Sequence, residues 1–436
     1  MRLKLLKNIW VDSLVATGFI FFVMYALSGL FSAFEAIDPI GEALDDVEFT
    51  DIVYSKLRAD PHAEEDVVIV NMGSLPRKYV AEQIRIINKY NPKIIGIDSF
   101  FPYPKEGEGD SVLAAALNEV EHLVMASKML NFVEEENGNW YYDSLKLSAP
   151  AFRSNAQFAF ANLVTDEGVE QEDVKTTRSF SPTLPHKGDS SSLAFAVKIA
   201  SLFAPEKTER FLERNNEIEH INYKGNTLGS KSNFATTFSA LDVEQVLYEE
   251  FVPEMIEGKI VLFGFLGNYF GDRYNVEDKY FTPLNEKYAG RGEPDMYGVV
   301  IHANIISMIL DEKYVETIGQ NYKYLIAIIL CYFNVAAFMW VYYRLPAWYD
   351  GITKLAQLLE LLILVAIIIY AYHLYGWILE LTLAMAAVAV VGDSLEVYNG
   401  VVKNLFTKKG RKELFRIKKK VKKNKKGDKS TVVSLS

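Results

Sequence analysis

The sequence has almost no cysteine: Cys331 is the only one in 436 residues. Cys331 lies inside an apolar run, so the long polar segment before it, residues 35–321, contains none. This absence excludes disulfide bonds from that segment, which must supply its own hydrophobic core. A segment of that length is ample for one large domain.

Recognisable catalytic motifs are also missing. No serine, cysteine or threonine carries a nucleophile signature, so a hydrolase interpretation has no residue to support it. Gly264, Gly267 and Gly271 have the spacing G-x-x-G-x-x-x-G, and no helix opening on a lysine follows them, which argues against nucleotide binding. We therefore expect no enzyme activity and no cofactor.

Four apolar runs are each long enough to cross a bilayer as a helix: residues 9–31, 324–343, 355–375 and 377–397. The first exceeds the apolar core of a secretory signal, and residues 32–36 match a cleavage site poorly. We interpret it as an uncleaved anchor. The sequence thus predicts one transmembrane helix before the large segment and three after it.

Basic residues set the predicted orientation of these helices. Arg2, Lys4 and Lys7 precede the first run, and Arg344 and Lys354 flank the loop between the second and third. Positive residues favour the cytoplasmic side. We therefore predict that residues 1–8 and 399–436 are cytoplasmic and that residues 35–321 lie outside. A bacterial inner membrane suits this arrangement.

Charge divides along the same boundary. Residues 399–436 carry 14 Lys and Arg against two acids, a charge of +12, whereas residues 1–34 carry +2 and residues 322–398 carry −2. The total of −10 therefore leaves −22 on residues 35–321. Such a charge disfavours nucleic acid and anionic lipid as outside partners. The basic tail, with Leu414, Ile417 and Val421 at helical spacing, suits an anionic inner leaflet or an acidic partner.

The large segment alternates strand-like and helix-like patterns. "DVVIVNMG", "PKIIGIDSF" and "KIVLFGF" are apolar on both faces, as buried parallel strands are, and amphipathic or apolar helical stretches lie between them. Ser74 is placed to cap the helix that follows the first strand. The pattern predicts an α/β domain with a mainly parallel sheet, in which ligands bind at the carboxyl ends of strands.

Six stretches occur in an order that resembles a known family. They include "VVIVNMGSL", "NPKIIGIDSFF", "IEGKIVLFGFLGNYFGDRYNVEDKYFTPL" and "MYGVVIHANIISMIL". Together they resemble the second type of CHASE domain, the cyclase/histidine-kinase associated sensory extracellular domain, over residues 45–312. The family also has one span before the domain and typically three after it. The resemblance implies a bacterial extracytoplasmic sensor that signals to a cytoplasmic kinase, cyclase or phosphodiesterase.

The sequence departs from that family in two places. Residues 71–74 read Asn-Met-Gly-Ser where members usually carry an acidic residue, and the residues after the last span do not resemble an output domain. We therefore expect an unidentified outside ligand and a separate effector protein, with a homo-oligomer left open. A scaffold that only recruits envelope proteins is the alternative, and a periplasmic enzyme is a third interpretation.

Asp98, Asp272, Thr282 and His302 are the candidate ligand-binding residues. Asp98 and Asp272 lie at or just beyond the ends of predicted strands. With the imidazole of His302 they would suit a divalent cation if the fold brings them together. The alternative is an ordinary structural role for each: a cap or turn for Asp98, an ion pair on the solvated rim for Asp272, and a hydrogen-bonded core residue for His302. Thr282 precedes a proline and most simply ends its loop.

Carboxylates inside the apolar runs are the second set of candidates. Glu360 is the deepest, while Asp12, Glu380 and Asp393 lie within about a turn of a membrane face. A carboxylate at that depth is costly and usually faces a helix bundle or water. We expect Glu360 to hydrogen-bond a neighbouring span, with an ion pathway as the alternative.

Overall fold

The computed structural model describes residues 9–35, 51, 53–54, 62–105, 107–135, 137–165, 169–170, 176–187, 190–227, 237–272, 275–285 and 293–402. The basic tail from residue 403 onward lies outside the described residues. The chain forms two compact units, one of residues 40–316 and 372–377 and one of the remaining residues. We describe each by itself.

A nine-stranded sheet forms the centre of the first unit. Its strands are β1 (Val67–Asn71), β2 (Ile94–Ile97), β3 (Leu123–Glu134), β4 (Trp140–Lys146), β5 (Ala156–Phe160), β9 (Thr183–His186), β10 (Ser190–Leu193), β12 (Ser239–Leu241) and β13 (Ile260–Gly264). The order is β10-β9-β4-β3-β2-β13-β1-β12, with β5 also on β3. The pairings from β12 to β3 and the β3–β5 pairing are parallel, and every residue of β1, β2 and β13 is buried. The predicted α/β class with a mainly parallel sheet is confirmed.

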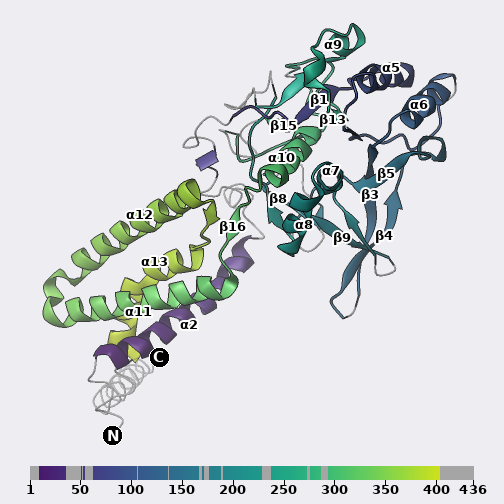
Figure 1. The fold of residues 1–436 in the computed structure, drawn as a ribbon. Helices are drawn as coiled ribbons and strands as arrows, with labels where there is room; N and C mark the ends of the chain where they lie inside the picture. The colour runs from purple at the N-terminus through teal and green to yellow at the C-terminus, as the bar shows by residue number, and fades with distance from the viewer. Residues whose placement is uncertain are drawn as a thin grey trace, which may run out of the picture. The chain divides into compact units, whose positions relative to one another are not determined.

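Helices cover both faces of this sheet (Figure 1). On one face α5 (Arg77–Asn88) packs against α6 (Gly109–Asn118) and α9 (Val243–Leu247), and on the other α10 (Gly298–Asp311) packs against α7 (Phe195–Phe203) and α8 (Pro205–Glu213). Helix α5 turns its apolar stripe, with Val80, Ile84 and Ile87, toward the strands. The unit is thus a three-layer α/β/α domain.

Two glycines let helices approach the sheet closely. A Cβ atom at Gly264, the last residue of β13, would lie 2.5 Å from Cβ of Val299 in α10. One at Gly96 of β2 would lie 2.6 Å from Cδ1 of Ile199 in α7. Because neither glycine has a side chain, the first turn of α10 rests directly on the carboxyl end of β13.

Part of the sheet differs from the predicted pattern. The second half of β3 runs on to Glu134 and pairs antiparallel with β4, which leads to β9 and β10.

The prediction that Ser74 caps α5 is wrong. The helix begins after Pro76, which provides no side-chain cap, and the hydroxyl of Ser74 donates to Asn268 Oδ1 at 3.0 Å.

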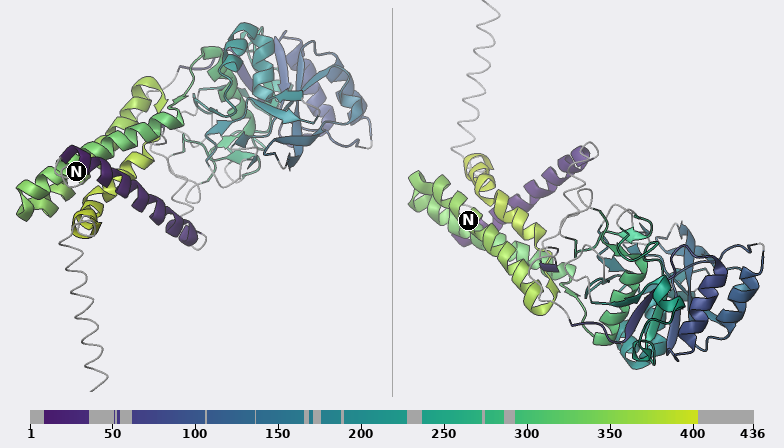
Figure 2. Two further views of the ribbon diagram at one scale, coloured as in Figure 1. Left: turned by 90° about the horizontal axis from the view of Figure 1, so that it is seen from below. Right: turned by 90° about the horizontal axis from the view of Figure 1, so that it is seen from above.

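The second unit contains four long helices, α2 (Ile9–Glu35), α11 (Gln320–Arg344), α12 (Tyr349–Tyr375) and α13 (Thr382–Val397). Each is long and apolar enough to cross a membrane, α13 together with the π-helical residues 398–402 that continue it, and one is N-terminal and three are C-terminal as predicted. Helix α2 crosses beside α11 and α13 (Figure 2), and their buried residues, such as Ala16, Val335 and Val391, form one cluster.

Candidate functional site

Asp98 and His302 converge at the carboxyl end of the parallel sheet. Asp98 directly follows β2, and its N–H donates to Phe263 O of the neighbouring strand at 2.8 Å, which fixes its position. His302 lies in the second turn of α10, held on β13 by the contact at Gly264. The His302 Nε2 atom lies 4.0 Å from Asp98 Oδ2. The fold therefore brings together two of the predicted residues that are 204 positions apart.

Burial drives both groups toward their neutral forms. The side chains of His302 and Asp98 are 5% and 13% exposed. Loss of solvation lowers the pKa of His302 to about 4 and raises the pKa of Asp98 to about 7. At 4.0 Å the two do not form a hydrogen bond, and among the described residues Nδ1 of His302 has no hydrogen-bond partner either.

Asp278 is the third member of this site, and sequence reasoning missed it. Its carbonyl accepts the N–H of Gly298, the first residue of α10, at 3.0 Å. A Cβ at Gly298 would lie 3.1 and 3.2 Å from the two carboxylate oxygens of Asp278, so the carboxylate lies beside the helix N-terminus. Burial first, and then the charge of Asp98, raise the pKa of Asp278 to about 8. At neutral pH the largely buried carboxyl of Asp98 and the carboxyl of Asp278, a more exposed residue, therefore compete for protons here.

Asp272 lies beside this group rather than within it. Asn268 Nδ2 donates to Asp272 Oδ2 at 3.1 Å, and Lys279 Nζ donates to its carbonyl at 3.2 Å. The charges of Asp272 and Asp278 add to burial in raising the pKa of Tyr297 to about 12. The Tyr297 hydroxyl is buried with no hydrogen-bond partner among the described residues.

Thr282 lies at a different place and is engaged within the protein. Its hydroxyl donates to Asp295 Oδ2 at 2.7 Å and its N–H to Asp295 Oδ1 at 2.9 Å. Asp295 is buried, and burial raises its pKa to about 7 in spite of these hydrogen bonds. This pair holds the segment before Pro283 against the strand that leads to α10.

The site does not have the geometry of a metal centre in the part of the chain that the structure describes. No three His, Cys, Asp or Glu residues there are arranged to hold a metal ion. Asp98, Asp272 and His302 thus do not form a ligand set. Asp98, Asp278 and His302 form a cluster at the start of α10 in which the pKa values of the two carboxyls, about 7 and about 8, lie near neutral pH. We call it the α10 carboxylate site.

A second polar cluster lies at the other end of α10, and nothing in the sequence pattern pairs its members. Lys224 Nζ lies 2.7 Å from Glu64 Oε2 and 3.4 Å from Asp311 Oδ2, and Ser307 of α10 also hydrogen-bonds Glu64. Burial would raise the pKa of Glu64, but the hydrogen bonds from Lys224 and Ser307 lower it overall. The cluster borders a cavity of about 460 Å³.

The membrane-unit carboxylates each contact a neighbouring helix. Glu360 of α12 hydrogen-bonds the side chain of Asn334 in α11. Glu380 pairs with Lys323, and Asp393 pairs with Lys354 at 2.6 Å. The remaining one, Asp12, accepts the hydroxyl of Tyr398 at 3.0 Å. These contacts link α11 to α12, α11 to the start of α13, α12 to α13, and α2 to the residues after α13.

The α/β unit matches a known domain family. A model of the CHASE2 domain family matches residues 49–341, about two thirds of the chain. The chain belongs to the CHASE2 domain family. The CHASE2 match covers the whole α/β unit from residue 49 and continues through nearly all of α11. No curated protein and no solved structure matches the chain.

The CHASE2 domain is a sensory domain of the extracellular CHASE type. With the four apolar helices, this makes the protein a multi-pass membrane protein that carries a sensory domain. The α10 carboxylate site and the Lys224 cluster both belong to that domain.

Proposed function

We propose that this protein is a bacterial inner-membrane sensor that detects an extracytoplasmic ligand or protein and signals through a separate cytoplasmic or membrane partner. The observation that carries the proposal is the CHASE2 match over residues 49–341, which joins the sensory domain to α11. The basic residues at 2, 4, 7, 344 and 354 support a cytoplasmic amino terminus and a domain on the outside.

Helix α10 provides a route for the signal. Its first turns carry the α10 carboxylate site, its last turns carry the Lys224 cluster, and only residues 312–319 separate its end from the start of α11. Ligand binding can shift such an element only by the difference in affinity for its two positions. A ligand that changes the protonation or contacts of Asp98 and Asp278 would bias the position of α10, and the chain would pass that bias to α11.

The cytoplasmic partner would meet the residues that follow α13. Residues 399–436 carry 14 Lys and Arg, which suits an acidic protein surface or the anionic inner leaflet. The contacts of Glu360 with Asn334 and of Asp393 with Lys354 tie the helices together, so a shift of α11 would reach α12 and α13 as a unit.

Purification from native membranes tests the proposal against a scaffold. The sensor predicts that a kinase, cyclase or phosphodiesterase co-purifies with the full chain, and that its activity changes in an Asp98→Asn variant. The exposed Asp66→Asn variant is the control. Recovery of envelope assembly proteins alone, with no such enzyme in repeated preparations, would favour the scaffold. Turnover of a substrate by the purified chain, lost in Asp98→Ala and Asp272→Ala, would favour an enzyme.

A further inference from the structure

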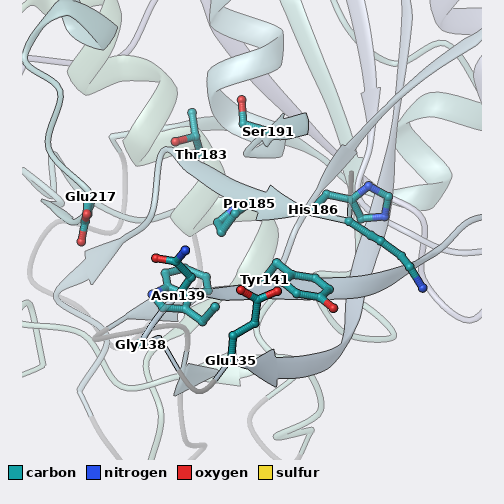
Figure 3. A pocket seen from close by; sticks show the side chains of 11 residues that line it. Glu135, Gly138, Asn139, Tyr141, Thr183, Pro185, His186, Ser191 and Glu217 are labelled. Atoms are coloured by element: carbon teal, nitrogen blue, oxygen red, sulfur yellow. The ribbon is translucent and has the colours of Figure 1, made fainter. Parts of the chain in front are cut away.

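A groove of about 770 Å³ lies on the antiparallel part of the sheet, away from the α10 carboxylate site (Figure 3). Strands β4 and β9 run parallel there but are joined at a single register position, Tyr142 opposite His186. Pro185 has no N–H to donate, so it does not extend the hydrogen bonding between β4 and β9. The two strands therefore separate on the amino-terminal side of this pair, and the groove lies between them.

Aromatic and apolar surfaces form part of the wall. Trp140 and Tyr141 come from β4, and Pro185 comes from β9. In Figure 3 the ring of Tyr141 and the ring of Pro185 lie on opposite sides of the groove. All three residues line the groove and are half-buried, so part of each remains open to solvent. Phe132 of β3 packs against Trp140 across the antiparallel β3–β4 pair, with ring centroids 5.7 Å apart and an interplanar angle of 32°.

Hydrogen-bonding groups of both kinds surround these rings. They are the hydroxyls of Thr183 and Ser191, the amide of Asn139, the carboxylates of Glu135 and Glu217 and the imidazole of His186, whereas the ammonium group of Lys187 is paired with Asp143 at 2.5 Å. The lining thus offers several donors and several acceptors at the edges of flat apolar faces. This mixture excludes a purely apolar ligand, which would leave those polar groups unpaired.

The turn between β3 and β4 positions two of the polar groups. The N–H of Glu135 donates to Asn139 O at 2.7 Å, and Gly138, with φ +86°, donates to Glu135 O at 2.9 Å. Asn137 Nδ2 donates to the Glu135 carboxylate at 3.0 Å. These bonds fix the backbone of Glu135 and Asn139 and orient one carboxylate before any ligand binds, which reduces the entropic cost of binding.

We propose that this groove binds a saccharide chain. Sugar rings have apolar C–H faces that stack on indole and phenol rings, and hydroxyl edges that both donate and accept hydrogen bonds. A small cation fits less well, because the Glu135 carboxylate is already engaged by Asn137 and the groove offers at least as many neutral polar groups as carboxylates. The volume lies in the usual range of ligand sites and exceeds that of a single sugar ring.

The inference deepens the proposed function and rests on it in one respect: a glycan meets the groove in the cell only if the domain lies outside. It assigns the class of ligand that the sensor would detect. The binding itself is a property of the groove and is measured on purified protein, independently of membrane sidedness.

Intrinsic fluorescence gives a specific readout, because Trp140 is the only tryptophan between residues 40 and 316. The full chain is solubilised in a detergent without a sugar headgroup. It is prepared as wild type and with Trp10, Trp340, Trp348 and Trp377 replaced by phenylalanine. The probes are oligomers of N-acetylglucosamine, cello-oligosaccharides and malto-oligosaccharides, with spermine as the cationic probe.

We expect at least one of the three saccharide series to shift Trp140 emission saturably and to bind more tightly as the chain lengthens. By calorimetry, Trp140→Ala and Tyr141→Ala should each weaken that binding about tenfold or more, a loss of roughly 1.4 kcal/mol. The matched control is Tyr248→Ala, which removes an exposed ring next to α9, beside the opposite edge strand β12. It should leave binding unchanged.

Three results would overturn the inference: no saturable binding of any saccharide series, binding that survives Trp140→Ala, or binding of spermine alone. A thermal melt of each variant shows whether a loss of binding reflects unfolding, and Tyr141→Phe, which keeps the ring, should retain most of the affinity. If the domain proves to face the cytoplasm, the proposed function fails whatever the groove binds. If the domain faces outward and no saccharide binds, only this inference fails.

Discussion

Nε2 of His302 lies 4.0 Å from Oδ2 of Asp98, and burial moves both groups toward their uncharged forms. This proximity brings the residue after β2 next to the second turn of α10. It places a carboxyl group whose pKa is about 7 at the start of α10, the helix that leads to α11. The stability of the domain should therefore depend on pH in a direction that the structure specifies.

Asp98→Asn should stabilise the protein at high pH. The pKa of Asp98 is about 7 in the folded protein against 3.8 for its ordinary value, so the unfolded chain releases this proton first as pH rises. The ionised Asp98 therefore lowers the free energy of unfolding progressively as the pH rises from 3.8 to 7, and this destabilisation is complete above pH 7. We expect the Tm of Asp98→Asn to exceed that of wild type by about 3 °C or more at pH 8, and to match it within about 1 °C at pH 4.

His302 acts in the opposite direction, in a different pH range. Its pKa falls from 6.5 to about 4 on folding, so acidification from 6.5 to 4 favours the unfolded chain. The effect of His302 is present in both wild type and Asp98→Asn, so it cancels from the difference between their Tm values. Asp66→Asn, at an exposed site, is the control. A Tm difference for Asp98→Asn that is constant from pH 4 to pH 8 would contradict the account.

Lys224→Met should be strongly destabilising. The substitution leaves the carboxylate of Glu64, which is 6% exposed, without its cation at 2.7 Å. Removing one partner of a buried pair typically costs about 3–5 kcal/mol. Chemical denaturation of the solubilised chain measures the loss. Lys313→Met, which removes a lysine that is 73% exposed, is the matched control and should cost under about 0.5 kcal/mol.

The double variant separates charge from packing at this cluster. Glu64→Leu combined with Lys224→Met removes both charges, so most of the lost stability should return. If the double variant is as unstable as Lys224→Met alone, the unpaired carboxylate is not the cause.

Gly264→Ala tests the contact that sets the position of α10. The new Cβ would lie 2.5 Å from Cβ of Val299, so the helix must move away from β13. We expect a loss of about 1–3 kcal/mol in the free energy of unfolding. Gly264→Ala with Val299→Ala should recover part of it. Gly109→Ala, where the nearest atom would be 3.6 Å away, should change stability little. Equal effects at the two glycines would contradict this packing.

Glu360 should matter to the membrane unit through its hydrogen bond to Asn334. Glu360→Gln retains a group that can bond Asn334, whereas Glu360→Leu removes it. Unfolding in mixed micelles should show Glu360→Leu to be less stable by roughly 0.6–1.7 kcal/mol, the range for polar contacts between membrane helices. Glu360→Gln should lie near wild type. Loss of signalling in Glu360→Gln with unchanged stability would favour an ion pathway instead.

The sequence allowed prediction of the elements whose pattern is local. Strands β1, β2 and β13 are short apolar runs bounded by polar residues, and the apolar stripe of α5 repeats at helical spacing. The hydrophobic pattern of each segment is therefore enough to predict these elements. The membrane helices follow from length and apolar composition in the same way. Asp98 was a candidate because it follows a predicted strand, but the sequence left open whether Asp98 and His302 come together, because their proximity depends on how α10 packs on the sheet.

The residues that sequence reasoning missed depend on contacts between distant segments. Asp278 lies in a loop with φ +57°, and only the fold brings it beside Gly298 of α10. Glu64 stands in an acidic run before β1 and is matched with Lys224 by tertiary packing alone. Strands β4 and β9, at the edge of the sheet beyond β3, carry mixed polar and aromatic residues because they are only half-buried, so their sequences show no clear hydrophobic period.

The side of the membrane on which each unit lies tests the central claim most directly. Cys331 is replaced by serine, and one new cysteine is introduced at Ser154 in the CHASE2 domain or at Ser430 in the basic tail. A membrane-impermeant maleimide is then added to cells whose outer envelope has been permeabilised. The account predicts labelling of Ser154→Cys while the inner membrane is still intact, and of Ser430→Cys only after that membrane has been lysed. Labelling of Ser430→Cys in intact cells, with Ser154→Cys protected until lysis, would contradict it.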